Sequence, residues 1–547
     1  MTLAPYLSRR ALPFWPLFAG VLALLILAPV VSVVWLAFHP TENIWPHLLS
    51  TVLPRYLLNT LRLMLGVTVL AVVAGTGAAW LVTVHRFPGS RWLDLALFFP
   101  LAVPAYVGAY ALVDILDYPG LVQSWLRQAM GWQSARDYWF PDVRNAWGAS
   151  LVLGGALYPY VYLLARAAFR EQSGTIHDVA RALGAGPYRL FWSVGLPLAR
   201  PAIAAGVALA LMEVLADYGT VQHFGVQTLT TGIFTTWLTA GNAGGAAQIA
   251  LVVLVMVSGL MWVERAGRAQ ARHHGLSRAD RPIRPIPLAG WRGGFAFLFC
   301  FLPFAGGFLL PVAVMLYYAW AAPSGWLSPD LGRALAHTLL VASLAALVTV
   351  ALALVVVFGL RSARGRWAGR LSALTALGYA TPGAVLALGL LIPLASLDHH
   401  LADLVSVVTG RDPGLVLTGT ATALILAYVV RFFGVAQGGI AAGMGRVAPS
   451  LPMAARMLGR GQGGALFGVY LPIMRGTLAT ALVMVFVDSV KELPATLLLR
   501  PFNFNTLATR VFEQASLERL HDAAPAALLV MAVGLCAVVL LIRGDHR

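Results

Sequence analysis

Long apolar stretches recur from one end of the chain to the other, and they constrain the fold more than any other feature. A helix needs about 20 mostly apolar residues to cross the roughly 30 Å hydrocarbon core of a bilayer. Only 11% of the residues are charged, against about 25% in soluble domains. We therefore predict an all-α polytopic membrane protein, because lipid offers the backbone no water partners and favours helices. The twelve predicted spans are 13–38, 57–84, 93–115, 147–169, 201–223, 246–264, 294–320, 336–360, 371–396, 417–440, 476–497 and 523–543.

The positive charge of the chain follows the same topology. The formal net charge is +16, and cytoplasmic loops of membrane proteins are enriched in Lys and Arg. We therefore predict that both termini are cytoplasmic and that the charge reflects topology and not nucleic-acid binding. The most basic segment is the linker after the sixth span, which could also contact anionic lipid. Its arginines are Arg265, Arg268, Arg272, Arg278, Arg281, Arg284 and Arg292.

Lys491 is the only lysine, and no glycine lies near it in VDSVKELPAT. A Walker A site needs a lysine directly after its glycines, because the ammonium contacts the nucleotide phosphates. Any ATP hydrolysis would therefore take place on a separate chain. No nucleophile with its own base and orienting acid is apparent from spacing. We predict that this chain is not an enzyme and binds no cofactor of its own.

The chain contains an internal repeat in its predicted cytoplasmic segments. DVARALGAGPYRLFWSVGLPLARP begins at Asp178, and MAARMLGRGQGGALFGVYLPIMRG begins at Met453, 275 residues later. Near the starts of the two halves the offset is 278, and Pro104 there matches Pro382. An even number of spans gives both halves one orientation, so the pseudo-two-fold axis would follow the membrane normal. The predicted parts are a first half at 1–264, a basic linker at 265–293 and a second half at 294–547.

The repeated segments resemble the EAA loop of ABC importer permeases: Glu-Ala-Ala, three residues, Gly, nine residues, then Ile-x-Leu-Pro. Both copies keep this spacing, although Asp178 replaces Glu and Met453 has no carboxylate. The resemblance implies two type I permease repeats with EAA loops at about 171–200 and 445–475. Their coupling helices, at about 178–190 and 453–466, would dock on a homodimeric ATPase that carries ATP and Mg²⁺. The implied coupling residues are Asp178, Ala180, Gly184, Leu196, Pro197, Ala454, Ala455, Gly459, Leu471 and Pro472.

A second resemblance is more specific. EVLADYGTVQHFGVQTLTTGI from Glu213 and KELPATLLLRPFNFNT from Lys491 look like the ferric-iron permease branch of the same family. Members of that branch fuse two halves in one chain and receive substrate from a periplasmic iron-binding protein at the bacterial inner membrane. Related fused permeases for thiamine and other small solutes share much of the pattern. An ion-coupled secondary transporter is the alternative from another class, although it would not need two coupling loops.

Four carboxylates fall inside predicted spans. Glu213 and Asp217 are four residues apart, which places them on one helix face, and Asp488 and Glu492 match them at offset 275. Ionisable groups inside a membrane are costly and usually face a cavity or a partner. They could line the translocation pathway, where a passing hard cation would suit their oxygen atoms. They could instead be structural, with Lys491 paired to a carboxylate and the helices broken near Gly219 or Pro494, or they could contact an outer partner.

Polar segments follow the fifth and eleventh predicted spans. Thr230, Thr231, Asn503 and Asn505 could form docking surface for a binding protein, or belong to loops that pack on their neighbours. Thr231 and Thr506 align at offset 275. The group Asp398, His399, His400 and Asp403 has some spacing of a metal cluster, but we predict a solvated external turn there.

Overall fold

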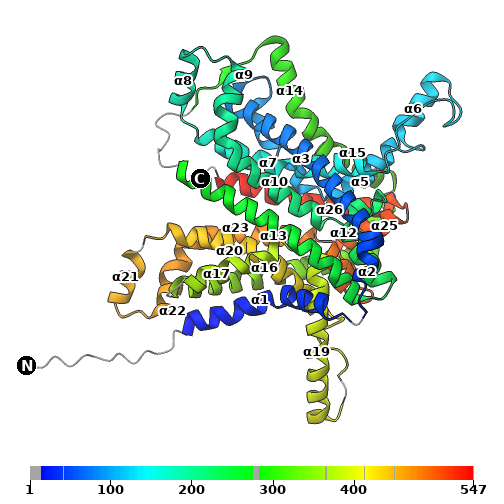
Figure 1. Cartoon of the computed structure of the whole chain (residues 1–547). Helices are drawn as coiled ribbons and strands as arrows, with labels where there is room; N and C mark the ends of the chain where they lie inside the picture. The colour runs from blue at the N-terminus through cyan, green and yellow to red at the C-terminus, as the bar shows by residue number, and fades with distance from the viewer. Residues whose placement is uncertain are drawn as a thin grey trace, which may run out of the picture.

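The computed structural model describes residues 14–40, 42–274, 283–363, 366–411, 413–448 and 450–545. Within these residues the fold is helical (Figure 1), apart from β1 (His85–Arg86), which pairs in parallel with β2 (Ile286–Pro287). In this described part, eleven helices are long and apolar enough to cross a membrane, and one further pair of helices is bent. Counting that pair as one span gives the twelve predicted. The expected all-α polytopic class is confirmed.

The helices of the first half cover residues 14 to 274. They are α1 (Phe14–Phe38), α2 (Trp45–His47), η1 (Leu48–Val52), α3 (Leu53–Val84), α4 (Ser90–Ala96), η2 (Phe99–Ala102), α5 (Ala105–Leu116), α6 (Leu121–Met130), α7 (Ala146–Glu171), α8 (Gly174–Ala182), α9 (Pro187–Leu190), η3 (Phe191–Gly195), α10 (Leu196–Ala216), α11 (Gly219–His223), α12 (Leu229–Phe234), η4 (Thr235–Thr239) and α13 (Ala243–His274).

The second half begins after β2. Its helices are α14 (Gly290–Phe304), η5 (Ala305–Leu309), α15 (Leu310–Ala321), η6 (Pro323–Leu327), α16 (Pro329–Ser362), α17 (Arg366–Thr375), α18 (Leu377–Ala380), α19 (Gly383–Thr409), α20 (Ala421–Arg446), α21 (Ser450–Met457), α22 (Gln462–Ala465), η7 (Leu466–Tyr470), α23 (Leu471–Val490), α24 (Pro494–Leu499), α25 (Leu507–Ser516) and α26 (Leu520–Asp545).

The third predicted span of each half is interrupted at a proline. Ser90–Ala102 and Ala105–Met130 meet at a bend of 96°, with Pro104 in extended conformation before α5. In the second half Pro382 precedes α19 in the same way. Proline has no backbone N–H and disfavours helix in the residue before it. The expectation of one continuous helix at 93–115 and at 371–396 was therefore wrong.

The fifth predicted span of each half is also interrupted. α10 ends at Ala216 and α11 begins at Gly219, while α23 ends at Val490 and α24 begins at Pro494. The spans predicted at 201–223 and 476–497 are thus each a long helix, a break and a short helix, as in the alternative with breaks near Gly219 and Pro494. Each break carries one intramembrane carboxylate, Asp217 or Glu492, whereas Glu213 and Asp488 lie in the last turns of α10 and α23.

The two halves interlock. α1 packs on α16 and α19 of the second half, and α15 packs on α5 of the first half as well as on α26. In Figure 1 the short connectors α8, α9, α21 and α22 lie at one end of the bundle, opposite α6 and α25. α13 continues beyond Glu264. The boundaries at 264 and 293 stay a prediction.

Candidate translocation site

A cavity of about 120 Å³ lies where the interrupted spans of the two halves meet. Its walls come from the η2–α5 bend, from α7 and α20, and from the two breaks after α10 and α23. The four carboxylates singled out in the sequence all line this cavity, together with two cations, four tyrosines and a phenylalanine. These charged and aromatic residues are Glu213, Asp217, Asp488, Glu492, Arg431, Lys491, Tyr106, Tyr160, Tyr218, Tyr379 and Phe432.

Asp217 and Glu492 occupy equivalent positions in the two halves and make equivalent hydrogen bonds. The Asp217 carboxylate accepts hydrogen bonds from the backbone N–H groups of Thr220 and Val221, at 3.0 and 3.1 Å. The Glu492 carboxylate accepts from the backbone N–H groups of Ala495 and Thr496, both at 3.0 Å. Each acid therefore caps the short helix that follows its break. These two carboxylates therefore have a structural role within the membrane.

Two cations in the cavity pair with the two acids of the second half. Arg431 of α20 lies with its Nη1 3.7 Å from Glu492 Oε1, and Lys491 Nζ lies 2.9 Å from Asp488 Oδ1. Sequence reasoning raised the pairing of Lys491 but missed Arg431. The signal was available, since an arginine inside the apolar run AYVVRFFG is as costly as a carboxylate there.

The cavity is asymmetric in charge. At offset 275 the positions of Arg431 and Lys491 are taken by Ala156 and Ala216, which also line the cavity. Within the described residues, Glu213 makes no hydrogen bond or ion pair. Four carboxylates face two cations, so the fully ionised lining carries a surplus of two negative charges. Such a lining attracts cations and repels anions.

The carboxylates do not converge into a metal centre in this conformation. Over the described ranges, no group of three or more His, Cys, Asp or Glu side chains is placed to hold a metal ion. Two of the acids are held by caps, and Asp488 is paired with Lys491. The arrangement therefore suits a polar passage rather than a resident metal.

Comparison with known proteins identifies the family to which this chain belongs. Residues 71–267 match the family described as "Binding-protein-dependent transport system inner membrane component". The molybdenum transport system permease protein ModB of Escherichia coli K12 is 30% identical over 204 residues, which are 35% of this chain and 85% of ModB. The chain belongs to the binding-protein-dependent inner-membrane permease family.

Two further relatives extend the comparison. The Fe(3+)-transport system permease protein FbpB 2 of Haemophilus influenzae is 26% identical over 490 residues, which are 88% of each chain. The sulfate transport system permease protein CysT of Escherichia coli K12 is 27% identical over 220 residues, 39% of this chain and 76% of CysT. The chain is thus an ABC importer permease of the inner membrane, in a family that works with a periplasmic binding protein and an ATPase.

The two EAA-like segments adopt the same local structure in this permease. α8 and α21 end just before Gly184 and Gly459, whose φ angles are 84° and 77°. These left-handed glycines end the helices with a hydrogen bond from Ala185 N to Ala180 O and from Arg460 N to Ala455 O, both 3.0 Å. Both helices are shorter than expected and begin earlier than 178 and 453. The π-helices η3 and η7 then lead into Leu196-Pro197 and Leu471-Pro472.

Apolar side chains are exposed around both connectors. Large exposed apolar groups on a polar rim mark interaction surfaces. In the first half they are Ile176, Val179, Leu183 and Tyr188, and in the second half they are Leu451, Met453, Met457 and Leu458. Asp178 is exposed beside them. Both connectors therefore present an exposed apolar interaction surface.

The first connector is anchored to the bundle by a polar contact absent from its counterpart. His177 Nε2 lies 3.0 Å from Gln172 Oε1, and Gln172 donates to the Gly195 carbonyl at 3.0 Å. The His177 ring stacks on Trp80 of α3. Burial lowers the pKa of His177, so the ring is neutral at neutral pH. At offset 275 the positions of Gln172 and His177 hold Val447 and Pro452.

The segments expected to dock a binding protein divide into buried and accessible residues. Thr230 and Thr231 are 2% and 7% exposed. Thr231 forms a capping box with Thr228 at the start of α12, and Thr506 forms one with Thr509 at the start of α25. Thr228 therefore matches Thr506 at offset 278, and the alignment of Thr231 with Thr506 was wrong. Burial leaves Thr230 and Thr231 a packing role in this conformation.

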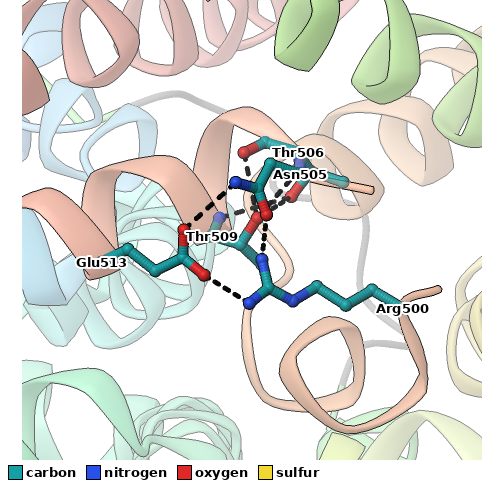
Figure 2. A network of polar contacts seen from close by, with 5 residues as sticks. All are labelled: Arg500, Asn505, Thr506, Thr509 and Glu513. Carbon is teal, nitrogen blue, oxygen red and sulfur yellow. Dashed lines mark hydrogen bonds and ion pairs between the residues drawn. The ribbon is translucent and has the colours of Figure 1, made fainter. Parts of the chain in front are cut away.

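Asn503 and Asn505 lie nearer the surface. Asn503 is exposed with φ of 59°. Figure 2 shows Asn505 between Arg500 and Glu513, both of which bind it, while Arg500 also pairs with Glu513. The Thr506–Thr509 capping box lies directly beside this network. A charged, ordered loop thus follows α24.

The predicted solvated turn at Asp398 was wrong for that residue. Asp398 is fully buried. Its carboxylate accepts backbone hydrogen bonds from Val416, Leu417 and Thr418 at 2.7 to 3.0 Å. It fixes the loop that returns from α19, the helix that projects from the body in Figure 1. His399, His400 and Asp403 are exposed as expected, but they lie within the helix α19 and not in a turn.

Proposed function

We propose that this permease imports ferric iron, which a periplasmic binding protein delivers at the outer face. The observation that most supports this proposal is the cavity between the broken spans, which is lined by four carboxylates and only two cations. Hard oxygen ligands and a surplus of negative charge suit a small, highly charged cation. The similarity over 88% of the chain to a protein named for Fe(3+) transport supports the same substrate.

The charge of the cavity also separates this substrate from those named for other relatives. ModB and CysT are named for molybdenum and sulfate transport. An oxyanion would meet the unpaired Glu213 and the three other acids. Coulombic repulsion between like charges is strongest where the dielectric is low. We therefore rank ferric iron above an oxyanion. Thiamine, a small organic cation, is the second candidate, since the same negative surplus would admit it.

The mechanism we infer is alternating access. Two identical ATPase subunits, which carry ATP and Mg²⁺, close on α8 and α21 and draw the two connectors together. The connectors lead through η3 and η7 into α10 and α23, so their movement separates the breaks at Asp217 and Glu492. The cavity then opens outward to the loaded binding protein, and ATP hydrolysis restores the inward-facing state. Both termini of the permease are cytoplasmic in this scheme, as the arginine distribution predicts.

The most direct test of the cavity's charge replaces the two carboxylates that cap no helix. Glu213→Gln with Asp488→Asn removes two negative charges and retains the side-chain shapes. Asp217 and Glu492 are less suitable, because an alanine there also removes a helix cap, which costs about 1 kcal/mol each. Asp330→Asn is the matched control, since Asp330 is exposed and outside the cavity.

The experiment measures uptake of labelled ferric iron in cells deleted for this chain and then complemented. Thiamine, molybdate and sulfate are supplied in parallel. We expect iron uptake to be lost on deletion, restored by the wild type and by Asp330→Asn, and abolished by the double variant. Permease that still co-purifies with its ATPase shows that assembly is intact. Unchanged iron uptake in the deleted cells would overturn the assignment, and loss of thiamine uptake instead would establish the second candidate.

A further inference from the structure

A second polar cavity lies away from the translocation site, beside the β1–β2 pair. This groove has a volume of about 530 Å³. We propose that it binds a phosphate group, carried in the headgroup of an anionic phospholipid. Its walls come from the end of α3, from α4, from the end of α7 and from the segment that enters the second half. The lining residues are Val82, Thr83, Arg86, Arg91, Asp94, Leu95, Arg170, Ile283 and Pro285.

The charge balance of the groove is positive. Asp94 is the single acid among the lining residues, and it is already neutralised. Arg166 donates to both Asp94 oxygens at 2.6 and 2.7 Å, and Arg170 donates to Oδ2 at 2.8 Å. The side chains of Arg86 and Arg91 make no hydrogen bond or ion pair with any residue that the structure describes. Two guanidinium groups are therefore available, and their forked donors match phosphate oxygens.

The groove is built rather than incidental. The backbone of Arg86 is fixed by the parallel pairing of β1 with β2 and by a hydrogen bond from Leu288 N to Arg86 O at 2.7 Å. The Thr83 hydroxyl is buried without a partner in the described part of the chain. A buried hydroxyl without a partner is costly, and a phosphate oxygen would satisfy it.

The position of the groove favours a lipid over a soluble phosphate compound. Arg170 stands near the end of α7, four residues before α8 begins, which places the groove at the connector end of the bundle. Trp92, 43% exposed, packs against Phe297 and Phe301 next to it. Tryptophan gathers at the level of lipid headgroups, and basic pockets between helices on the cytoplasmic side bind acidic headgroups. Val82, Leu95 and Ile283 offer an apolar wall for the glycerol and upper acyl chains.

A lipid in this groove would connect the two halves. Arg86 and Arg91 belong to the first half, whereas Ile283 and Pro285 belong to the segment leading into the second. A bound headgroup would hold that segment against α4, next to the connector α8 that faces the ATPase. We therefore expect anionic lipid to stabilise the assembled permease.

The test uses full-length permease purified in nanodiscs of phosphatidylcholine containing phosphatidylglycerol. Native mass spectrometry counts the phosphatidylglycerol retained on the protein after the nanodisc is removed. We expect Arg86→Gln with Arg91→Gln to weaken retention roughly tenfold or more, since each arginine near a membrane surface contributes about fivefold in affinity. Arg361→Gln with Arg370→Gln is the matched control, with the same change of charge at other arginines, and should retain lipid as the wild type does.

Three outcomes decide the proposal. Equal retention by wild type and the Arg86/Arg91 variant overturns it, as does equal loss in the control variant. Displacement of phosphatidylglycerol by millimolar inorganic phosphate, but not by chloride at the same ionic strength, would confirm the phosphate site and overturn the lipid as its source. Thr83→Val is the second variant, because it removes the unpartnered hydroxyl without a change of charge. Thr83→Val should reduce the retention of phosphatidylglycerol, but by less than the Arg86/Arg91 variant does. It therefore tests the site even where the double arginine variant folds poorly.

Discussion

The two halves of the permease build the cavity from the same skeleton but with different charges. Each half supplies a long helix, a break and a short helix, and each break carries a carboxylate that caps the short helix, Asp217 or Glu492. Only the second half adds cations, Arg431 and Lys491, where the first half has Ala156 and Ala216. Duplication thus preserved the fold, while the charge of the cavity diverged.

This comparison separates structural from transport roles. A role shared by both halves, such as capping a short helix, is imposed by the broken span itself. A feature of one half, such as the Arg431–Glu492 pair or the unpaired Glu213, is not needed to build the skeleton. The variants below test this separation in order of decreasing effect on stability.

Removal of Arg431 should have the largest effect. Arg431→Met leaves the buried carboxylate of Glu492 without its cation, and breaking a buried pair costs about 3–5 kcal/mol in free energy of unfolding. Tryptophan fluorescence during thermal unfolding of the purified permease measures the loss. Arg431→Met with Glu492→Gln should recover most of it, because no uncompensated charge remains. If the double variant is as unstable as the single one, the ion pair is not the source of the effect.

The two caps should differ by the ion pair that one of them also carries. Asp217→Ala removes the acceptor for two backbone N–H groups and should cost about 1–2 kcal/mol. Glu492→Ala removes the same kind of cap and also leaves the buried Arg431 without its carboxylate, so it should cost more. Asp217→Asn retains an acceptor oxygen and should cost clearly less than Asp217→Ala. The same thermal unfolding measurement applies, and no loss of stability in Asp217→Ala would show that this break does not depend on its cap.

The connector glycines should show the next effect. Gly184 and Gly459 have positive φ, where a Cβ atom costs about 1–2 kcal/mol, and nothing lies within 4 Å of a Cβ atom added at either glycine. Gly184→Ala and Gly459→Ala should therefore fray the ends of α8 and α21 without a clash. ATPase bound per permease, measured by co-purification, should fall in both variants. Gly186→Ala, at an open position with negative φ, is the control and should bind ATPase as the wild type does.

Sequence reasoning reached the class, the repeat and the four carboxylates because each leaves a mark in composition or spacing. Apolar length fixes a span, and a charge inside one is conspicuous. It raised breaks near Gly219 and Pro494 only as an alternative, since an apolar run does not reveal where a helix yields to a capping side chain. It also misaligned Thr231 with Thr506, because three residues are gained between Glu492 and the second capping box. Only the contacts of Thr60 with Leu229 N and of Thr338 with Leu507 N fix that register.

Glu213 should give the smallest effect on stability and a large one on transport. Its side chain has no hydrogen bond or ion pair to lose within the described residues, so Glu213→Gln should change the free energy of unfolding by less than about 0.5 kcal/mol. Iron uptake by complemented cells should nevertheless fall, because the one acid not committed to a cap or a cation is the one free to meet the substrate. Asp488→Asn, which leaves Lys491 unpaired, should lose both stability and uptake. Equal iron uptake by Glu213→Gln and the wild type would contradict a transport role for Glu213. That role would then fall to the paired acids of the second half, Asp488 and Glu492.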